Sequence, residues 1–251
     1  MLYSICVVAW SNKGVIMFTN QSKERMPIPK NKFHTIAEVR DYDIAASRNT
    51  LLYPMQRLQD LVKPYVSQGQ RIVNLGCETG ILTLMLGGEC RVAITGIDED
   101  PLLLKGANEN LRIAKLCNYP GDAMFICAPF DSLPIESHSV DIVFADNFIY
   151  RCDKIEDVLK ESRRIVKEDG IILFNQLLRD ADKEKIRFIK QYLKIDSFGG
   201  EKEFMDTLNS CYSFNEYEKV LIENSDWGFE IRKEQMSAII SYNLDESNLD
   251  L

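Results

Sequence analysis

The stretch that decides the fold is Arg71-Ile72-Val73-Asn74-Leu75-Gly76-Cys77-Glu78-Thr79-Gly80, which is followed by the apolar residues 81–86. A short run rich in β-branched residues is typical of a buried strand. The bracketing glycines indicate a turn. We therefore expect a strand over 71–75, a turn over 76–80, and a helix from 81 that stops at Gly87-Gly88.

A second unit of the same kind follows. Residues 92–97 predict a strand that ends at Asp98, which lies 22 residues after Gly76. Pro101 suits the first turn of the next helix, expected to run to about Cys117. An acid at this distance from a glycine turn is placed to accept hydrogen bonds from a ribose diol, although Asp98 could also be a plain helix cap.

The alternation of strand and helix continues to residue 174. Further strands are predicted over 124–127, 140–145 and 171–174, with a helix of period 3.6 over 155–166 and Gly170 at its end. The sequence therefore predicts an α/β fold: a doubly wound, mostly parallel seven-stranded sheet with an antiparallel last strand and helices on both faces. The core of this unit is expected over 71–175.

The flanking segments complete the predicted organisation. Residues 1–33 predict a hairpin (strands 4–9 and 15–19) and a polar arm, and 34–66 predict two helices interrupted by Pro54. Residues 183–210 predict a charged helical insertion, a candidate cap or lid. Residues 214–244 predict the last helix and a pair of antiparallel strands over 229–236 and 238–244. The domain proper is thus expected over 34–251.

Composition narrows the class of function. The chain has 251 residues, 38 Asp and Glu against 30 Lys and Arg, and a net charge of −8. That charge opposes binding to nucleic acid or to an anionic membrane. Its seven cysteines form no CxxC pair, so no metal site is predicted. With no spanning segment or leader recognised, we expect a cytoplasmic protein.

The turn itself restricts the ligand. Glu78 stands where a dinucleotide fold has its second glycine, and a carboxylate there would repel a pyrophosphate. No Gly-Lys-Ser/Thr sequence follows, so a phosphate-binding Walker loop is absent as well. A cofactor that contains adenosine but no phosphate, with a cationic sulfonium, would tolerate that acid. A nucleotide-dependent oxidoreductase remains a weaker alternative.

Four motifs in this order resemble those of class I S-adenosylmethionine-dependent methyltransferases, in particular the small-molecule branch that includes ubiquinone and menaquinone C-methyltransferases. They are Arg71–Gly80, Gly96-Ile97-Asp98-Glu99-Asp100-Pro101, Leu133-Pro134-Ile135 with Ser139–Asp146, and Ile165-Val166-Lys167-Glu168-Asp169-Gly170. The resemblance covers roughly residues 38–175. It implies S-adenosylmethionine as cofactor and a Rossmann-like methyltransferase fold.

The resemblance also implies roles for individual residues. The turn would pass the methionine part of the cofactor, Asp98 would hold the ribose, and the other candidates would surround the adenine and the sulfonium. The full set of candidate cofactor-binding residues is Tyr42, Asn74, Gly76, Cys77, Glu78, Gly80, Asp98, Glu99, Phe130, Asp131 and Asp146. Tyr42, Phe130 and Cys77 could equally be core residues.

Three departures from the family pattern stand out. Asn74 replaces the usual acid that helps to fix the cofactor amino group, so it keeps an acceptor but loses the charge. Glu78 replaces a frequent glycine, and we expect it to restore part of that charge. Pro129 stands where the family often has an acid for the adenine, so Asp131 or a backbone group must serve.

The expected function is transfer of a methyl group to a small-molecule acceptor. Tyr150 and His34 are the candidate catalytic residues, and no dedicated base is required for a good nucleophile. The alternative is a non-catalytic S-adenosylmethionine-binding regulatory or partner module on the same fold. A homodimer through the N-terminal region is expected in either case.

Overall fold

The computed structural model describes residues 10–11, 14–15, 24–26, 33–49, 52–192 and 198–244. Its centre is a seven-stranded sheet in the order β5-β4-β3-β6-β7-β9-β8. The strands are β3 (Ile72–Leu75), β4 (Ala93–Asp98), β5 (Asp122–Cys127), β6 (Val140–Asp146), β7 (Val166–Leu177), β8 (Glu230–Lys233) and β9 (Ser237–Tyr242).

The sheet is mixed in the way the sequence predicts. β3 pairs in parallel with β4 and β6, β4 with β5, and β6 with β7. β9 is antiparallel to both β7 and β8. The predicted α/β class, the seven strands and the antiparallel last strand are confirmed. The chain order reverses between β3 and β6, which is the switch point where open parallel sheets bind ligands.

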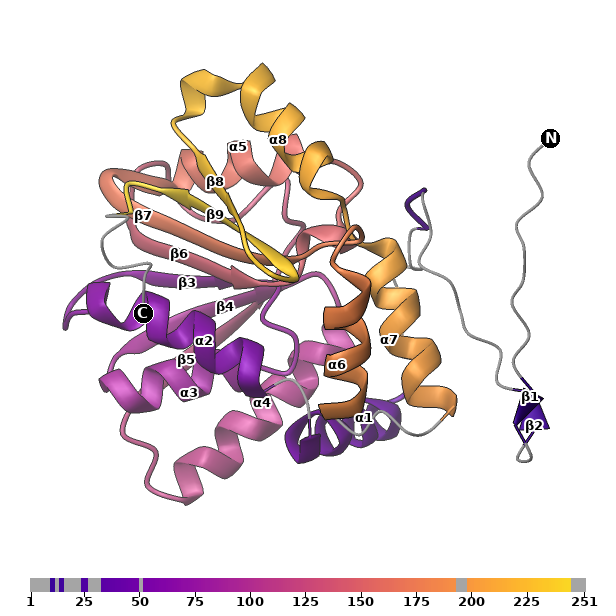
Figure 1. Ribbon diagram of the computed structural model, residues 1–251. Helices are drawn as coiled ribbons and strands as arrows, with labels where there is room; N and C mark the ends of the chain where they lie inside the picture. The colour runs from indigo at the N-terminus through magenta and orange to yellow at the C-terminus, as the bar shows by residue number, and fades with distance from the viewer. Residues whose placement is uncertain are drawn as a thin grey trace.

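Helices cover both faces of the sheet (Figure 1). One face carries α2 (Leu52–Val62), α3 (Ile81–Cys90) and α4 (Pro101–Leu116), and the other carries α5 (Ile155–Ile165) and α8 (Phe214–Glu223). Successive strand residues alternate between two cores: Ile142 packs with α2 and α3, and Val143 packs with α5 and α8. Because side chains alternate along a strand, this double burial explains why the central strands are apolar throughout.

The remaining helices lie near the carboxyl ends of the parallel strands (Figure 1). They are α1 (Ile36–Asn49), α6 (Lys183–Tyr192) and α7 (Phe198–Ser210). α7 buries Met205 and Leu208 in the core on the α5 face. The expected single insertion over 183–210 is therefore two helices, with residues 193–197 outside the described part.

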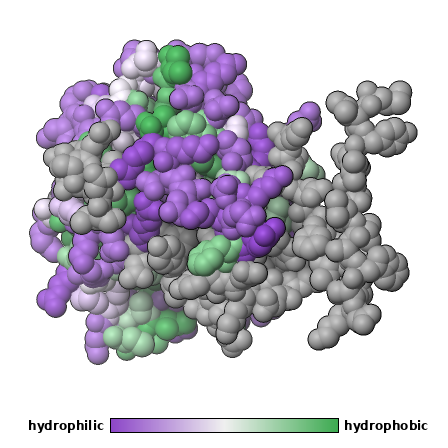
Figure 2. All heavy atoms as spheres, in the orientation of Figure 1, coloured by the Kyte–Doolittle hydropathy of each residue, from purple (hydrophilic) through white to green (hydrophobic). Residues whose placement is uncertain are grey.

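Figure 2 shows that hydrophilic side chains cover much of the described surface in this view, with hydrophobic patches between them. Two of the exposed large hydrophobic residues, Ile113 and Leu116, belong to the last turns of α4. Among the described residues, no helix has the length and apolar character needed to cross a bilayer.

Three local expectations were wrong. α3 runs through Gly87-Gly88 to Cys90, because both glycines face Tyr119: a Cβ on Gly87 would lie 2.5 Å from its hydroxyl. Gly170 lies inside β7, where a Cβ would meet the Asp141 carbonyl at 2.8 Å beside a register shift in the β6–β7 pairing. These glycines permit close packing, which a sequence pattern does not distinguish from a helix stop.

The third concerns Pro54. The chain does form two helices before β3, followed by the short 3₁₀ helix η1 (Lys63–Tyr65). Pro54, however, is the third residue of α2, in its first turn, where a missing N–H costs little. The predicted N-terminal hairpin is described only at β1 (Trp10–Ser11), which pairs antiparallel with β2 (Gly14–Val15). Its expected strands 4–9 and most of 15–19 lie outside the described residues.

Candidate functional site

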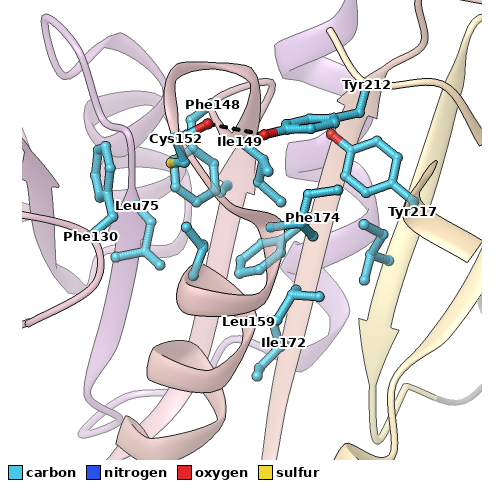
Figure 3. Close-up of a cluster of buried hydrophobic side chains, with 14 of the residues drawn as sticks. Leu75, Phe130, Phe148, Ile149, Cys152, Leu159, Ile172, Phe174, Tyr212 and Tyr217 are labelled. Carbon is cyan, nitrogen blue, oxygen red and sulfur yellow. Dashed lines mark hydrogen bonds between the residues drawn. The ribbon is translucent and has the colours of Figure 1, made fainter. Parts of the chain in front are cut away.

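The turn after β3 is buried and held in an unusual backbone conformation. Gly76 and Gly80 have φ values of +65° and +76°, and Glu78 between them has a φ of +48°. A Cβ on Gly76 would lie 2.3 Å from the Cβ of Phe148. Phe148 is itself fixed, because its ring packs edge-on against Phe130 and Phe174 at centroid distances of 5.0 and 5.7 Å (Figure 3). The glycine turn therefore lies directly against the core.

Asp98, at the end of β4, lies beside this turn and is fully buried. Its Oδ2 accepts a hydrogen bond from the backbone N–H of Glu78 at 3.0 Å, and its Oδ1 accepts one from the N–H of Asp100 at 3.0 Å. The predicted acid and the predicted turn are thus in contact. The alternative role predicted for Asp98 was a helix cap. Asp100 fills that role instead, because its carboxylate accepts a hydrogen bond from Leu102 N.

Arg151 reaches Asp98 from the other side of the switch point. It ends the 3₁₀ helix η2 (Ile149–Arg151), which follows β6. Its Nη2 donates to Asp98 Oδ1 at 2.6 Å and its Nη1 donates to Oδ2 at 2.9 Å, a bidentate pair. The pair raises the pKa of the arginine above its ordinary value despite burial, which acts in the opposite direction.

The middle of α1 also contacts the turn. Tyr42 donates its hydroxyl hydrogen bond to Glu78 Oε2 at 2.9 Å. Asp43 accepts a hydrogen bond from the Thr79 hydroxyl and another from Asn110 Nδ2, the latter at 2.9 Å. The structure therefore brings Tyr42 to the turn, and the Asp43 network joins α1 and α4 to it.

Asn74 offers an unused acceptor next to the turn. Its side chain is 2% exposed, and its Nδ2 donates to the Thr83 hydroxyl at 2.9 Å. Its Oδ1 is buried with no hydrogen-bond partner among the described residues. A buried acceptor without a partner costs free energy, so this atom suits a ligand that brings a donor such as an ammonium group.

The other candidates are spread around this centre. Glu99 accepts a hydrogen bond from Phe130 N at 3.1 Å, while Phe130 itself is a core residue, 2% exposed. Asp131 is exposed and lines a surface depression with Leu133 and Arg164. Cys77 is buried, and burial with the nearby Asp98 charge raises the pKa of its thiol, which keeps it protonated and unreactive.

Tyr150 and His34 were the candidate catalytic residues, and Asp146 was a candidate cofactor-binding residue near the sulfonium. Burial, opposed by a hydrogen bond from Asn175, raises the pKa of Asp146 to about 6, with a contribution from the Glu78 charge. Burial also raises the pKa of Tyr150 well above its usual value, so its hydroxyl is a hydrogen-bond donor at neutral pH. His34 is exposed at the start of α1.

Sequence reasoning missed the pairing of Arg151 with Asp98 and the network around Asp43. A signal for the first was present, since Arg151 follows β6 at the same sheet edge at which β4 ends. The sequence did not predict which acid it would meet. Asp43 follows Tyr42 in the stretch 42–45, which resembles the family's N-terminal helix, but the sequence assigned it no role, because its contacts depend on the packing of α1 against α4.

The raised pKa of Asp146 makes stability depend on pH. The folded state holds this proton more tightly than the unfolded chain, whose Asp pKa is near 3.8, so the stability this group contributes is lost as pH rises through about 6. Asp146→Asn removes that loss while keeping an acceptor for Asn175. We expect the variant to gain stability over the wild type as pH rises from about 4 to about 7, by about 2 kcal/mol. Urea unfolding across that range measures it, and a difference independent of pH would refute it.

Comparison with known proteins agrees with this geometry. Residues 73–174 match a family model described as a methyltransferase domain. A ubiquinone/menaquinone biosynthesis C-methyltransferase of Campylobacter jejuni is 28% identical over 187 residues, covering 69% of this chain and 76% of that protein. A ribosomal protein L11 methyltransferase of Acetivibrio thermocellus is 29% identical over 49% of this chain and 37% of its own length. The chain spans less than half of several curated relatives, for instance 40% of a malonyl-[acyl-carrier protein] O-methyltransferase of Marinomonas.

Solved structures show the same fold. A Methanococcus maripaludis protein, provisionally described as an S-adenosylmethionine-dependent methyltransferase, aligns with a TM-score of 0.64 at 17% identity over 87% of this chain and 98% of its own. A SAM-dependent methyltransferase from Aquifex aeolicus aligns with a TM-score of 0.55 at 12% identity over 83% and 98%. Residues 73–174 therefore resemble a methyltransferase domain, and the described part of the chain shares the fold of these solved structures.

Proposed function

We propose that this protein is an S-adenosylmethionine-dependent methyltransferase that acts on a small-molecule acceptor. The observation that carries the proposal is the contact between Asp98 and the glycine turn at the switch point, within the segment that matches the family. The unpartnered Asn74 Oδ1 supports it, because the amino group of the cofactor is a donor of the kind this buried oxygen lacks.

The residues present fit this cofactor, which when bound supplies a methyl group already activated by the sulfonium charge. Asn74 would accept from its amino group, Gly76 and Gly80 leave room for its chain, and Asp98 would hold the ribose hydroxyls. Tyr150, held protonated, can donate a hydrogen bond to an acceptor. Asp146, with a pKa near 6, can take up a proton at neutral pH. The protein's main contribution is to align the reactants and exclude water.

Ligand binding tests the cofactor assignment. The full chain is titrated with S-adenosylhomocysteine and, separately, with NAD by isothermal titration calorimetry. We expect saturable binding of S-adenosylhomocysteine at one site and none of NAD, since Glu78 would face the pyrophosphate. Binding of NAD without S-adenosylhomocysteine would refute the proposal.

The class of acceptor needs its own experiment, since relatives with protein and small-molecule acceptors both match. Methyl-labelled S-adenosylmethionine is incubated with the protein and an extract of its own cells, and the products are separated by size. We expect the label in the small-molecule fraction. The net charge of −8 supports this choice over nucleic acid. Label confined to protein would overturn the acceptor class and leave the cofactor intact.

The non-catalytic module remains a second candidate, because one observation favours it: Asp98, the acid expected to hold the ribose, is already paired with Arg151. Such a protein would bind S-adenosylhomocysteine, and no fraction would contain labelled product.

Dimerisation through residues 1–33 and a cytoplasmic location remain predictions, as does a lid role for α6 and α7. Size-exclusion chromatography of the full chain and of a variant lacking residues 1–23 tests the dimer.

A further inference from the structure

Every acceptor position on the Asp98 carboxylate is in use. Oδ1 accepts from Asp100 N and from Arg151 Nη2, and Oδ2 accepts from Glu78 N and from Arg151 Nη1. A carboxylate offers about four lone-pair directions. A ribose diol therefore cannot hydrogen-bond to Asp98 while the guanidinium stays in place.

We propose that Arg151 closes the ribose half of the cofactor site in the free protein, and that cofactor binding displaces it. The inference rests on the proposed function and adds a regulatory step to it. The guanidinium presents two parallel N–H groups to the two carboxylate oxygens, as the two hydroxyls of a ribose would. Arg151 is thus an internal competitor for the ligand.

The ion pair between Arg151 and Asp98 acts as a latch on the site, and Arg25 holds this latch closed. Its Nη2 donates to the carbonyls of Tyr150 and Cys152, the two residues that flank Arg151, at 2.6 and 3.1 Å. Its Nε donates to the Ser210 carbonyl at the end of α7, and its guanidinium stacks on Tyr212 at 4.1 Å from the ring centroid. The Tyr212 hydroxyl also donates to the Cys152 carbonyl (Figure 3). Arg25 is therefore a positioning residue that ties η2 to α7.

Glu78 is the acid best placed to receive the displaced guanidinium. Its backbone N–H shares Asp98 Oδ2 with Arg151, and its carboxylate lies on the turn beside them, bonded to Tyr42. A buried cation that loses its partner is costly unless another anion replaces it. The open state accordingly pairs Arg151 with Glu78, which gives Glu78 an indirect part in cofactor binding.

The first test is the affinity of the full chain for S-adenosylhomocysteine, measured by calorimetry. Arg151→Gln should bind about tenfold more tightly than the wild type, if the latched state outnumbers the open one by about ten to one. Arg163→Gln is the matched control: it is half-buried and ion-paired to Glu168, but it precedes the amino end of β7, opposite the site. It should bind like the wild type. Unchanged or weaker binding by Arg151→Gln would overturn the latch.

Arg25→Gln tests the same latch without touching the buried pair, so it remains decisive if Arg151→Gln does not fold. It should tighten binding by about threefold, because only the anchor of η2 is lost. Equal affinity of wild type, Arg151→Gln and Arg25→Gln rejects the latch while the cofactor site stands. If none of the three binds S-adenosylhomocysteine, the proposed function itself fails.

Glu78→Gln in two backgrounds tests where the guanidinium goes. In the wild type the substitution should weaken binding, because the open state loses its ion pair. In Arg151→Gln it should have no effect, because no guanidinium needs a partner. An equal loss in both backgrounds would show that Glu78 holds the cofactor directly and would overturn its part in the latch.

Discussion

Replacing Asp98 by Asn should abolish S-adenosylhomocysteine binding and destabilise the protein at the same time. The free energy of unfolding should fall by about 3 kcal/mol, because the substitution leaves the Arg151 cation buried without its counterion. Affinity should fall at least about 100-fold, since hydrogen bonds to a charged acceptor contribute about 1.5–3 kcal/mol each. Urea unfolding and calorimetric titration measure the two effects separately.

The double variant Asp98→Asn/Arg151→Gln distinguishes the two roles of Asp98. Removing the unpaired cation should restore most of the lost stability, because neither partner is then charged. Binding should stay lost, because the ribose acid is still missing. An Asp98→Asn protein that binds S-adenosylhomocysteine as the wild type does would contradict the assignment of this residue.

Gly76→Ala should be the most destabilising small substitution in the glycine turn. The new Cβ would lie 2.3 Å from the Cβ of Phe148, an atom attached to the backbone, at a residue whose φ is +65°. The left-handed conformation costs about 1–2 kcal/mol for a non-glycine residue, and overpacking adds about 1–3 kcal/mol. We expect a total loss of about 2–5 kcal/mol and no detectable cofactor binding.

Gly69→Ala provides the matched control. Gly69 has a φ of +84°, but nothing lies within 4 Å of the Cβ it would gain. It should lose only the conformational part, about 1–2 kcal/mol, and should bind S-adenosylhomocysteine normally. If the two alanine variants lose equal stability in urea unfolding, then contact with Phe148 is not what requires glycine at position 76.

The central strands of the sheet could be predicted because they are buried on both faces. A strand such as Ile72–Leu75 is a short and mostly apolar run. Gly76 and Gly80 mark the turn between this strand and the helix that follows it. Asp98 could be placed because sequence spacing alone puts it at the carboxyl edge of the sheet. Element ends were less predictable: Gly170 is required by a close approach of β6, a contact between segments that one strand's sequence does not encode.

The interactions across the site could not be predicted for the same reason. The ion pair of Arg151 with Asp98 joins residues 53 positions apart. The hold of Arg25 on η2 joins residues more than 120 positions apart. The sequence could place Gly76 and Asp98, because each lies at the end of one strand and is identified by the residues around it. The pairing of Arg151 with Asp98 follows only from the way three separate segments of the chain pack together.

A crystal structure of the full chain with S-adenosylhomocysteine tests the central claim most directly. We expect both ribose hydroxyls within hydrogen-bond distance of the Asp98 carboxylate, the amino group on Asn74 Oδ1, and the Arg151 guanidinium moved off Asp98. A ligand whose ribose lies anywhere other than against Asp98 would contradict the account.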